Sequence, residues 1–413
     1  MKKNILYIIP VGILLTVALM QGCMKERNFK ENGQDPNVSA TMAMKNTGVF
    51  ALSDKATLGK NIFFDKISVP VNMMSCASCH APDYGFTGSS ESNISGIYEG
   101  AFQGRYGNRK PPSAAYAASS PIFHYDGLNF IGGNFWDGRA TGERLKNPSA
   151  EQALGPFLNP LEMNNPSKES VLMQISKSSY AQMWESVWGV PIRYSTSTEI
   201  DDNYDRVGLA IAAYEASGEV SQFSSKFDYY LNGKVKLTTE EDAGRILFNG
   251  NKAKCSSCHV SDGNQPLFTD FTFENIGTPK NPDNPFYNED KVFLPNGHAI
   301  NPEGSAWIDP GLGGFLITQS TWSSMTAANW GKHKVPTLRN VGKSNGPYMH
   351  NGVFKSLNEV VHFYNTRDIT NLNWPKPEVS QNVNSEVGNL GLTDTEENEI
   401  VAFMKTLSDG YIY

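Results

Sequence analysis

Two segments of the chain repeat one pattern of glycine, basic and apolar positions. The first, "LGKNIFFD", spans residues 58–65, and the second, "AGRILFNG", spans residues 243–250. In each, a Gly and a basic residue precede apolar residues at roughly helical spacing, which predicts one helix in each half of the chain. The segment "TTEE" at 238–241 is a capping-box pattern that should open the second helix. The repeat therefore predicts two similar, mostly helical units.

A further helical pattern, "SLNEVVHFYN", lies at residues 356–365. Ser356 and Glu359 stand at capping-box spacing. Three residues recur at i, i+4 and i+7 and share one face: Leu357, Val361 and Tyr364. We therefore expect Tyr364 to point inward and His362 to point away. An inward Tyr is either a core residue whose hydroxyl bonds the backbone or a phenolate ligand to a metal, and the pattern leaves both open.

Residues 135–163 contain several Pro and Gly breaks and few sustained periodic runs. This pattern predicts an ordered loop with short helices, which carries Trp136, Gln152, Pro156 and Glu162. A single Glu in a loop is usually solvated. In the apolar, proline-bounded setting "FLNPLEM", Glu162 can instead be partly buried with a raised pKa.

The chain begins with a short basic stretch and an apolar run from Ile5 to Met20, followed by Cys23. This pattern predicts a secretory signal over residues 1–23, with lipid attachment at Cys23 as in bacterial lipoproteins. An uncleaved membrane anchor is the alternative, although the run is near the lower length limit for a membrane span. Residues 24–45 are polar and are expected to form a flexible tether.

Composition narrows the class of protein further. The 413 residues are enough for two domains, and the formal net charge of -7 argues against binding of nucleic acid. Charged residues make up only 19% of the chain, whereas Gly (37) and Pro (23) are plentiful, as in globular proteins with long ordered loops. We place the domains at residues 46–215 and 216–413.

The cysteines supply the chemistry. There are five, of which Cys23 is assigned to lipid. The other four form two pairs, each followed directly by a histidine: Cys76, Cys79 and His80, then Cys255, Cys258 and His259. Cys-x-x-Cys-His is the attachment pattern of c-type haem, in which two thiols bond the porphyrin and the next imidazole reaches the iron. A four-cysteine zinc site would leave both histidines unexplained. We therefore predict two covalently attached c-type haems in two cytochrome-c-like, mainly α-helical domains.

A protein with two haems is either an electron carrier or an enzyme, and the sixth ligand of each iron separates the two. A carrier fills both axial positions, whereas an enzyme that activates an oxidant leaves one open beside an acid or base. The histidines outside the haem motifs are His124, His298, His333, His350 and His362. Any of them is a candidate sixth ligand, but a surface or core role is the more common one for each.

Several motifs together resemble a known family. "FWDGRA", "EQALGPFLNPLEM", "KVPTLRNV", "GPYMHNGVFKSLNEVVHFY" and the two haem motifs resemble the bacterial dihaem cytochrome c peroxidase family, in particular its MauG and MbnH-like branch. The resemblance implies that His80 ligates an N-terminal haem that meets hydrogen peroxide. It also implies that Glu162 is the distal acid/base, that Gln152 and Pro156 line the distal pocket, and that Trp136 lies between the two haems.

The same resemblance implies that His259 ligates the second haem. Conventional members carry Met fourteen residues after the position of His350, where this chain has Tyr364. A Met ligand raises the potential of the iron, whereas a phenolate favours ferric and higher states. The Tyr points toward a protein that stores an oxidising equivalent and oxidises a partner protein.

Two other features of the family bear on this chain, a calcium site and a capping histidine. Asn345 and Pro347 fall where the family binds calcium through backbone oxygens, so one calcium ion is expected, although Ala117 and Ala118 stand near the place of the usual Asn. Lys110 stands where members that need reductive activation often carry a His that caps the N-terminal haem. His124 is nearby but at the wrong spacing, so we expect an open N-terminal haem.

The expected partners are hydrogen peroxide and either an electron-donor protein, such as a small cytochrome c or cupredoxin, or a protein substrate that is oxidised. The expected location is the periplasm or cell envelope, with membrane attachment through Cys23, and a homodimer is left open. The competing hypothesis is a dihaem electron-transfer lipoprotein without peroxidase chemistry.

Overall fold

The computed structural model describes residues 51–89, 95–288, 291, 293–294, 297, 299–344 and 346–413. The predicted signal, the tether, Cys23, Asn345 and His298 lie outside the described residues, so what was expected of them stays a prediction. Residues Val49–Tyr413 form one compact unit. No helix among the described residues combines the length and apolar character needed to cross a membrane.

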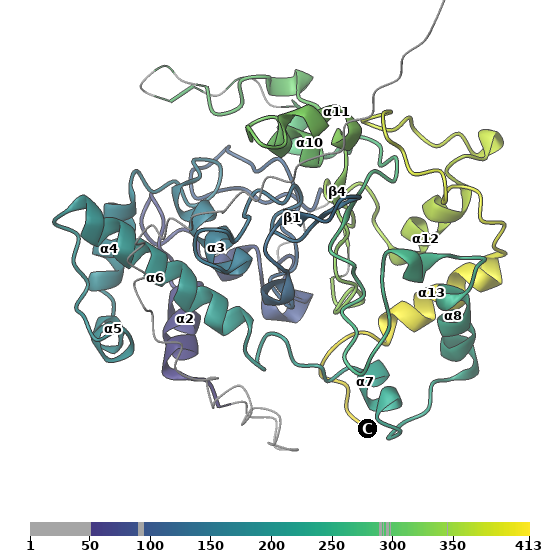
Figure 1. Cartoon of the computed structure of the whole chain (residues 1–413), viewed down its shortest axis with the longest axis horizontal. Coiled ribbons are helices and arrows are strands. Elements are labelled where there is room, and N and C mark those ends of the chain that lie inside the picture. Colours follow the sequence, from purple (N-terminus) through teal and green to yellow (C-terminus); the bar gives the residue numbers. More distant parts are fainter. Residues whose placement is uncertain are drawn as a thin grey trace, which may run out of the picture. The chain divides into compact units, whose positions relative to one another are not determined.

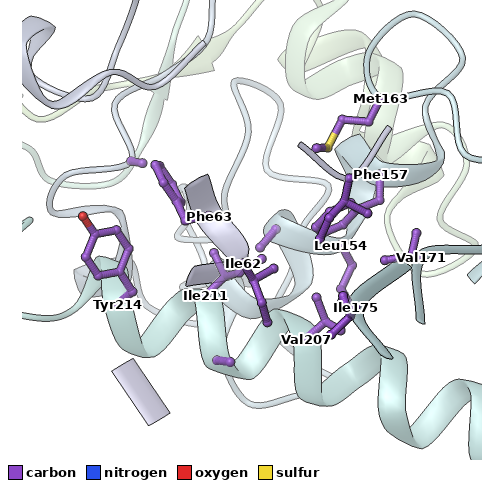
Figure 2. Close-up of a cluster of buried hydrophobic side chains, with 14 of the residues drawn as sticks. Ile62, Phe63, Leu154, Phe157, Met163, Val171, Ile175, Val207, Ile211 and Tyr214 are labelled. Carbon is purple, nitrogen blue, oxygen red and sulfur yellow. The ribbon is translucent and has the colours of Figure 1, made fainter. Parts of the chain in front are cut away.

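The helices of the N-terminal half lie together (Figure 1), and their buried side chains form one apolar cluster. These helices are α2 (Asp54–Phe64), α3 (Pro148–Leu158), α4 (Lys168–Ser176), α5 (Ala181–Trp188) and α6 (Ser197–Glu215). Figure 2 shows Ile62 and Phe63 of α2 facing Ile211 and Tyr214 of α6, and the rings of Phe63 and Tyr214 lie 5.4 Å apart. Full burial of each such side chain contributes about 1.5–3 kcal/mol of stability.

Helix α2 crosses α6 at a glycine. A Cβ atom added to Gly59 would lie 1.8 Å from the carbonyl oxygen of Ala210, so only Gly permits this approach. The side chain of Ser53 caps α2 by accepting the N–H of Ala56, and Thr196 with Glu199 forms a capping box on α6. Caps of this kind each contribute about 1 kcal/mol.

The C-terminal half repeats the arrangement. Its helices are α7 (Lys226–Leu231), α8 (Thr239–Asn249), α12 (Leu357–Thr366) and α13 (Asp394–Lys405). Helix α8 packs on α13, and a Cβ atom added to Gly244 would lie 1.8 Å from the carbonyl oxygen of Glu399. Thr238 and Glu241 form the predicted capping box. The predicted pair of matching helices is therefore confirmed, and each crosses a later helix at its glycine.

Helix α12 confirms one half of a predicted capping box and corrects the other. Ser356 accepts the N–H of Glu359 at 3.1 Å, as expected. The carboxylate of Glu359, however, accepts the N–H of Lys355 at 2.7 Å rather than that of Ser356. The buried face of the helix is the one expected: Leu357 and Val361 are buried, and His362 lies on the opposite side, where it bonds Glu397.

The remaining chain is mostly ordered loop. It holds the short helices α9 (Pro285–Asn288), α10 (Gly311–Leu316) and α11 (Thr326–Asn329). Single turns of 3₁₀ helix are η1 (Cys76–Ser78), η2 (Pro82–Tyr84), η3 (Ala117–Ser119), η4 (Cys255–Ser257), η5 (Gly304–Ala306), η6 (Ser323–Met325) and η7 (Thr370–Leu372).

Two small antiparallel pairs complete the secondary structure. Strand β1 (His124–Tyr125) pairs with β2 (Phe130–Ile131), and β3 (Phe273–Glu274) pairs with β4 (His333–Lys334). With strands this short, the mainly α class with long ordered loops is confirmed. The apolar cluster of the first half draws on buried residues between 58 and 220, and that of the second half on residues between 227 and 407. The domain boundary at residue 216 stays a prediction.

Candidate haem-binding and catalytic site

The first Cys-x-x-Cys-His motif forms a tight turn that presents its histidine. Cys76 opens the turn η1, and the backbone N–H of His80 donates to the carbonyl of Cys76 at 2.9 Å. The Nδ1 atom of His80 lies 2.9 Å from the carbonyl of Phe86. Because a carbonyl only accepts, Nδ1 carries the proton and Nε2 keeps its lone pair for a metal.

The second motif has the same geometry. The N–H of His259 donates to the carbonyl of Cys255 at 2.9 Å, and its Nδ1 lies 2.9 Å from the carbonyl of Phe268. Phe86 and Phe268 also share a positive φ, of 58° and 54°. The sequence repeat therefore extends to the orientation of each imidazole, as two equivalent metal-ligating histidines require.

The cysteines fit haem attachment and do not fit zinc. Burial raises the pKa of the Cys76 and Cys255 thiols to about 12, so both are neutral thiols in the folded chain. Within the described part of the chain, no cluster of three or more metal-ligating side chains contains a cysteine. Neutral thiols beside an apolar cavity suit thioether bonds to a porphyrin.

The predicted catalytic residues converge on the first motif. One cavity is lined by Cys76, Cys79, His80, Gln152, Pro156 and Glu162 together. Gln152 and Pro156 lie on α3, whose N-terminus is capped by the side chain of Asn147. Glu162 lies in the loop that follows α3, one turn beyond its end. Burial raises the pKa of Glu162, against opposing effects of Arg139 and a hydrogen bond from Asn159. A carboxyl group with a raised pKa holds a proton that it can exchange.

Trp136 lies where the two halves of the chain meet. Its indole Nε1 donates to the carbonyl of Lys110 at 2.7 Å, and its own carbonyl accepts the N–H of Lys334 at 2.8 Å. Trp136 lines both the cavity at the first motif and a larger cavity that reaches the second motif.

The larger cavity brings together the residues predicted for the second haem. Cys255, Cys258, His259 and Tyr364 line it, and so does His80. Among the described residues, no hydrogen bond of the Tyr364 hydroxyl is present, which agrees with a side chain that faces this cavity. Burial raises the pKa of Tyr364, so a phenolate at this position requires the charge of a metal.

Two residues weighed as caps of the first haem lie in different places. Lys110 lines both cavities, and its ammonium donates to the carbonyl of Thr87 at 3.1 Å. Burial lowers the pKa of Lys110 to about 7. His124 lies on the exposed strand β1, where its Nδ1 is 2.8 Å from the carbonyl of Ile122, and it lines neither cavity.

Pro347, a candidate for the calcium site, packs against Gly96 and lines neither cavity.

One buried acid of the site went unnoticed in the sequence. Glu215, at the end of α6, is 3% exposed and lines the same cavity as Glu162. Its Oε2 atom has no hydrogen-bond partner among the described residues, and burial raises its pKa to about 8 against a hydrogen bond from Ser149. The signal in the sequence is an acid inside the apolar run "AIAAYEA", where a solvated residue is not expected.

An ion-pair network ties the halves together beside Trp136. Arg109 bonds Asp137 at 2.6 Å and both carboxylate oxygens of Asp309, at 2.6 and 2.7 Å. Burial opposes ionisation of Asp309, but Arg109 and His333 hold its pKa well below the usual value. The stacked rings of His333 and His350, 3.6 Å apart, complete the cluster. Arg109 bonds both oxygens of the Asp309 carboxylate, so these side chains form a buried ion-pair network.

Two equivalent Cys-x-x-Cys-His turns, each presenting an imidazole to a buried cavity, define a c-type cytochrome with two haems. Residues 53–236 match the family described as di-haem cytochrome c peroxidase. The chain is 33% identical to the methylamine utilization protein MauG of Paracoccus denitrificans strain Pd 1222, over 86% of this chain and 88% of that protein. It is 28% identical to the cytochrome c551 peroxidase of Nitrosomonas europaea, over 86% and 80% of the two chains.

A solved structure agrees with these similarities. The diheme peroxidase BthA of Burkholderia thailandensis superposes with a TM-score of 0.72 at 31% identity, over 88% of each chain. The chain belongs to the di-haem cytochrome c peroxidase family and is an oxidoreductase of the kind that acts on peroxide. Two c-type haems follow from this membership, and the hypothesis of a carrier without enzyme chemistry is not favoured.

Proposed function

We propose that hydrogen peroxide is reduced at the haem held by Cys76, Cys79 and His80, with Glu162 as the acid/base. The observation that carries this proposal is the cavity in which Glu162 and Gln152 meet that motif. When bound, the haem supplies the redox-active iron; the protein supplies the proton chemistry and the shape of the pocket.

Glu162 has the properties that this role requires. Its carboxyl group takes a proton from one peroxide oxygen and returns a proton to the other, so that the oxygen leaves as water. Burial raises its pKa above that of a solvated Glu, which favours a carboxyl group that holds a proton it can exchange. Gln152 and Pro156 restrict the space beside it, which favours a small substrate.

We propose that electrons pass between the two haems through Trp136. Support comes from its backbone and indole hydrogen bonds, which join residue 110 in one half to residue 334 in the other. These bonds fix the ring in one orientation between the cavities, and a fixed distance is what a redox bridge needs.

For the second haem we propose ligands His259 and Tyr364. Support comes from the free hydroxyl of Tyr364 in the cavity that Cys255 and Cys258 also line. A phenolate ligand stabilises the ferric and higher states. This property favours oxidation of a side chain of a partner protein, as in a MauG-like enzyme, over supply of electrons by a small cytochrome c or cupredoxin.

The test of the acid/base is peroxide turnover by the haem-loaded enzyme. Glu162→Gln should lower the rate by about 10²–10⁴-fold, the usual contribution of a general acid/base. Glu185→Gln, a change at an exposed carboxylate on α5, is the matched control and should keep the wild-type rate. Turnover that persists in Glu162→Gln would assign the proton transfer to another group.

The test of the second ligand is the redox potential and spectrum of the haem at Cys255 and Cys258. Tyr364→Met should raise that potential and shift the spectrum toward that of a His–Met haem. Tyr364→Phe should leave an open or water-ligated iron. A spectrum that is the same in wild type and Tyr364→Phe would show that Tyr364 is not a ligand.

We further propose a periplasmic or envelope location with a lipid on Cys23, and one calcium ion near Asn345 and Pro347. Metal analysis of the purified protein tests the calcium. Release of the protein from membranes by Cys23→Ser tests the lipid, and the molar mass in solution tests a homodimer.

A further inference from the structure

A buried tyrosine from the N-terminal half and an aspartate near the C-terminus form a direct hydrogen bond. The hydroxyl of Tyr116 donates to Oδ2 of Asp409 at 2.7 Å. Tyr116 is 2% exposed and Asp409 is 4% exposed. The carboxylate also accepts from Asn340 at 2.9 Å and from the N–H of Ser224 at 3.0 Å, so it is held in one orientation.

Tyr116 faces the haem region. It lines the larger cavity together with His80 and His259, the two proposed proximal ligands. Its ring lies 5.5 Å from the guanidinium carbon of Arg339 and packs edge-on to Phe223, with ring centroids 4.9 Å apart. The ring is therefore fixed beside the space that both haems require.

Other tyrosines have one of these features without the other. Tyr287 donates to a carboxylate, that of Glu378, at 2.6 Å, but it lines neither cavity. Tyr348 lines the larger cavity, but its hydroxyl donates to the carbonyl of Val341 at 3.4 Å, which is not a base. In Tyr116 a proton acceptor and the haem cavity coincide.

The physical chemistry of a phenol gives this coincidence a consequence. Burial and the carboxylate of Asp409 raise the pKa of Tyr116, so the side chain does not ionise on its own. A neutral phenol that loses an electron becomes a strong acid, and its oxidation is easy only when a base takes the proton in the same step. Asp409, at hydrogen-bond distance and aligned by three donors, is such a base.

We propose that Tyr116 and Asp409 form a redox-active pair that holds one oxidising equivalent beside the haems. Tyr116 gives one electron to haem iron that peroxide has oxidised, and its hydroxyl proton moves to Asp409. The products are a neutral tyrosyl radical, a neutral carboxylic acid and an iron reduced by one electron. The step rests on the proposed function, because peroxide supplies the oxidant and the cavity holds the haems.

A series of contacts connects Asp409 to tyrosines at the protein surface. Ser224, which donates to Asp409, accepts the N–H of Tyr411 at 3.0 Å. The ring of Tyr411 lies 6.3 Å from that of Tyr229, and Tyr229 lies 4.4 Å from the exposed Tyr413. Tyr411, Tyr229 and Tyr413 therefore form a group of tyrosines that runs from the surroundings of Asp409, the proton acceptor of Tyr116, to the protein surface.

Freeze-quenched electron paramagnetic resonance of the oxidised holoenzyme, mixed with hydrogen peroxide, tests the pair. Wild type should give a tyrosyl signal that narrows when ring-deuterated tyrosine is incorporated. Tyr116→Phe should abolish it, and Asp409→Asn should lower its yield roughly tenfold or more, because the proton acceptor is gone. Tyr204→Phe is the control, since Tyr204 is buried but bonds only the carbonyl of Leu154.

The ferric haem signals in the same spectra separate the two proposals. If they change with peroxide and the tyrosyl signal is absent, or survives in Tyr116→Phe, the pair is overturned and peroxide chemistry at the haem stands. If they do not change with peroxide, the proposed function fails, and the pair fails with it. Asp409→Asn gives an independent answer should Tyr116→Phe load haem poorly.

Discussion

Replacement of Glu215 by Gln probes the cost of burying an acid beside the first haem motif. Within the part of the chain that the structure describes, the Oε2 atom of Glu215 has no hydrogen-bond partner, and burial raises its pKa from 4.5 to about 8. The folded enzyme therefore holds this carboxyl group protonated at neutral pH. Gln has the same shape, stays neutral at every pH and removes the titration.

The sign and the size follow from proton linkage. Below about pH 4.5 the group is protonated in both the folded and the unfolded chain, so pH has no effect. Between about pH 4.5 and 8 the unfolded chain releases the proton and the folded chain keeps it, so stability falls as pH rises. A shift of about 3.5 pKa units corresponds to about 5 kcal/mol in full, and to about 4 kcal/mol between pH 5 and 8.5.

Urea unfolding of the haem-loaded protein at several pH values measures this effect. The difference in the free energy of unfolding between Glu215→Gln and wild type isolates the one group, because all other titrations cancel. That difference should grow in favour of the variant by about 4 kcal/mol from pH 5 to pH 8.5. The exposed Glu185, changed to Gln, should show a difference that is flat with pH.

A difference for Glu215→Gln that does not change with pH would refute the reasoning. It would mean that the folded carboxyl group ionises as in the unfolded chain. Infrared spectra give an independent check, since wild type at neutral pH should show the band of a protonated carboxyl group that Glu215→Gln lacks.

Two further changes test the packing. Gly244→Ala should lower the free energy of unfolding by about 1–3 kcal/mol or more, because the new methyl group meets the carbonyl of Glu399. Gly107→Ala is the control, since its new methyl group has no atom nearer than 3.9 Å and should leave thermal melts almost unchanged. Arg339→Met leaves Asp228 buried without its ion-pair partner and should lower the free energy of unfolding by about 3–5 kcal/mol. The added change Asp228→Asn should recover part of that loss, because it removes the unpaired charge. Denaturant unfolding in which the double variant recovers none of it would contradict this account.

Local features of the chain could be predicted from the sequence. The attachment of haem needs two thiols and an imidazole at fixed spacing. The segments Cys76–His80 and Cys255–His259 therefore predict it without any tertiary contact. Helix periodicity likewise showed that Tyr364 points inward, and the capping box at Thr238 marked where α8 begins. These are properties of contiguous residues, and short-range geometry decides them.

Features that depend on distant segments could not be predicted in this way. Glu359 was assigned to the N–H of Ser356 and instead bonds Lys355, because the entry of the chain into α12 decides which donor is within reach. His124 lies near Lys110, the expected position of a capping His, in the sequence but on an exposed strand in space. Spacing along the chain therefore did not decide which side chains reach the first haem.

The sequence by itself determined the two haem motifs, the repeated helices and, through resemblance, the family. Only the tertiary structure decided which side chains share the cavities. Glu215 joins Glu162 because α6 packs on α3, and Tyr116 meets Asp409 across 293 positions of sequence. Burial creates the chemistry of both: removal from water keeps Glu215 protonated and leaves Tyr116 dependent on its neighbour for proton transfer. The apolar run around Glu215 signals that this acid is buried, but which groups it meets depends on the whole packed chain.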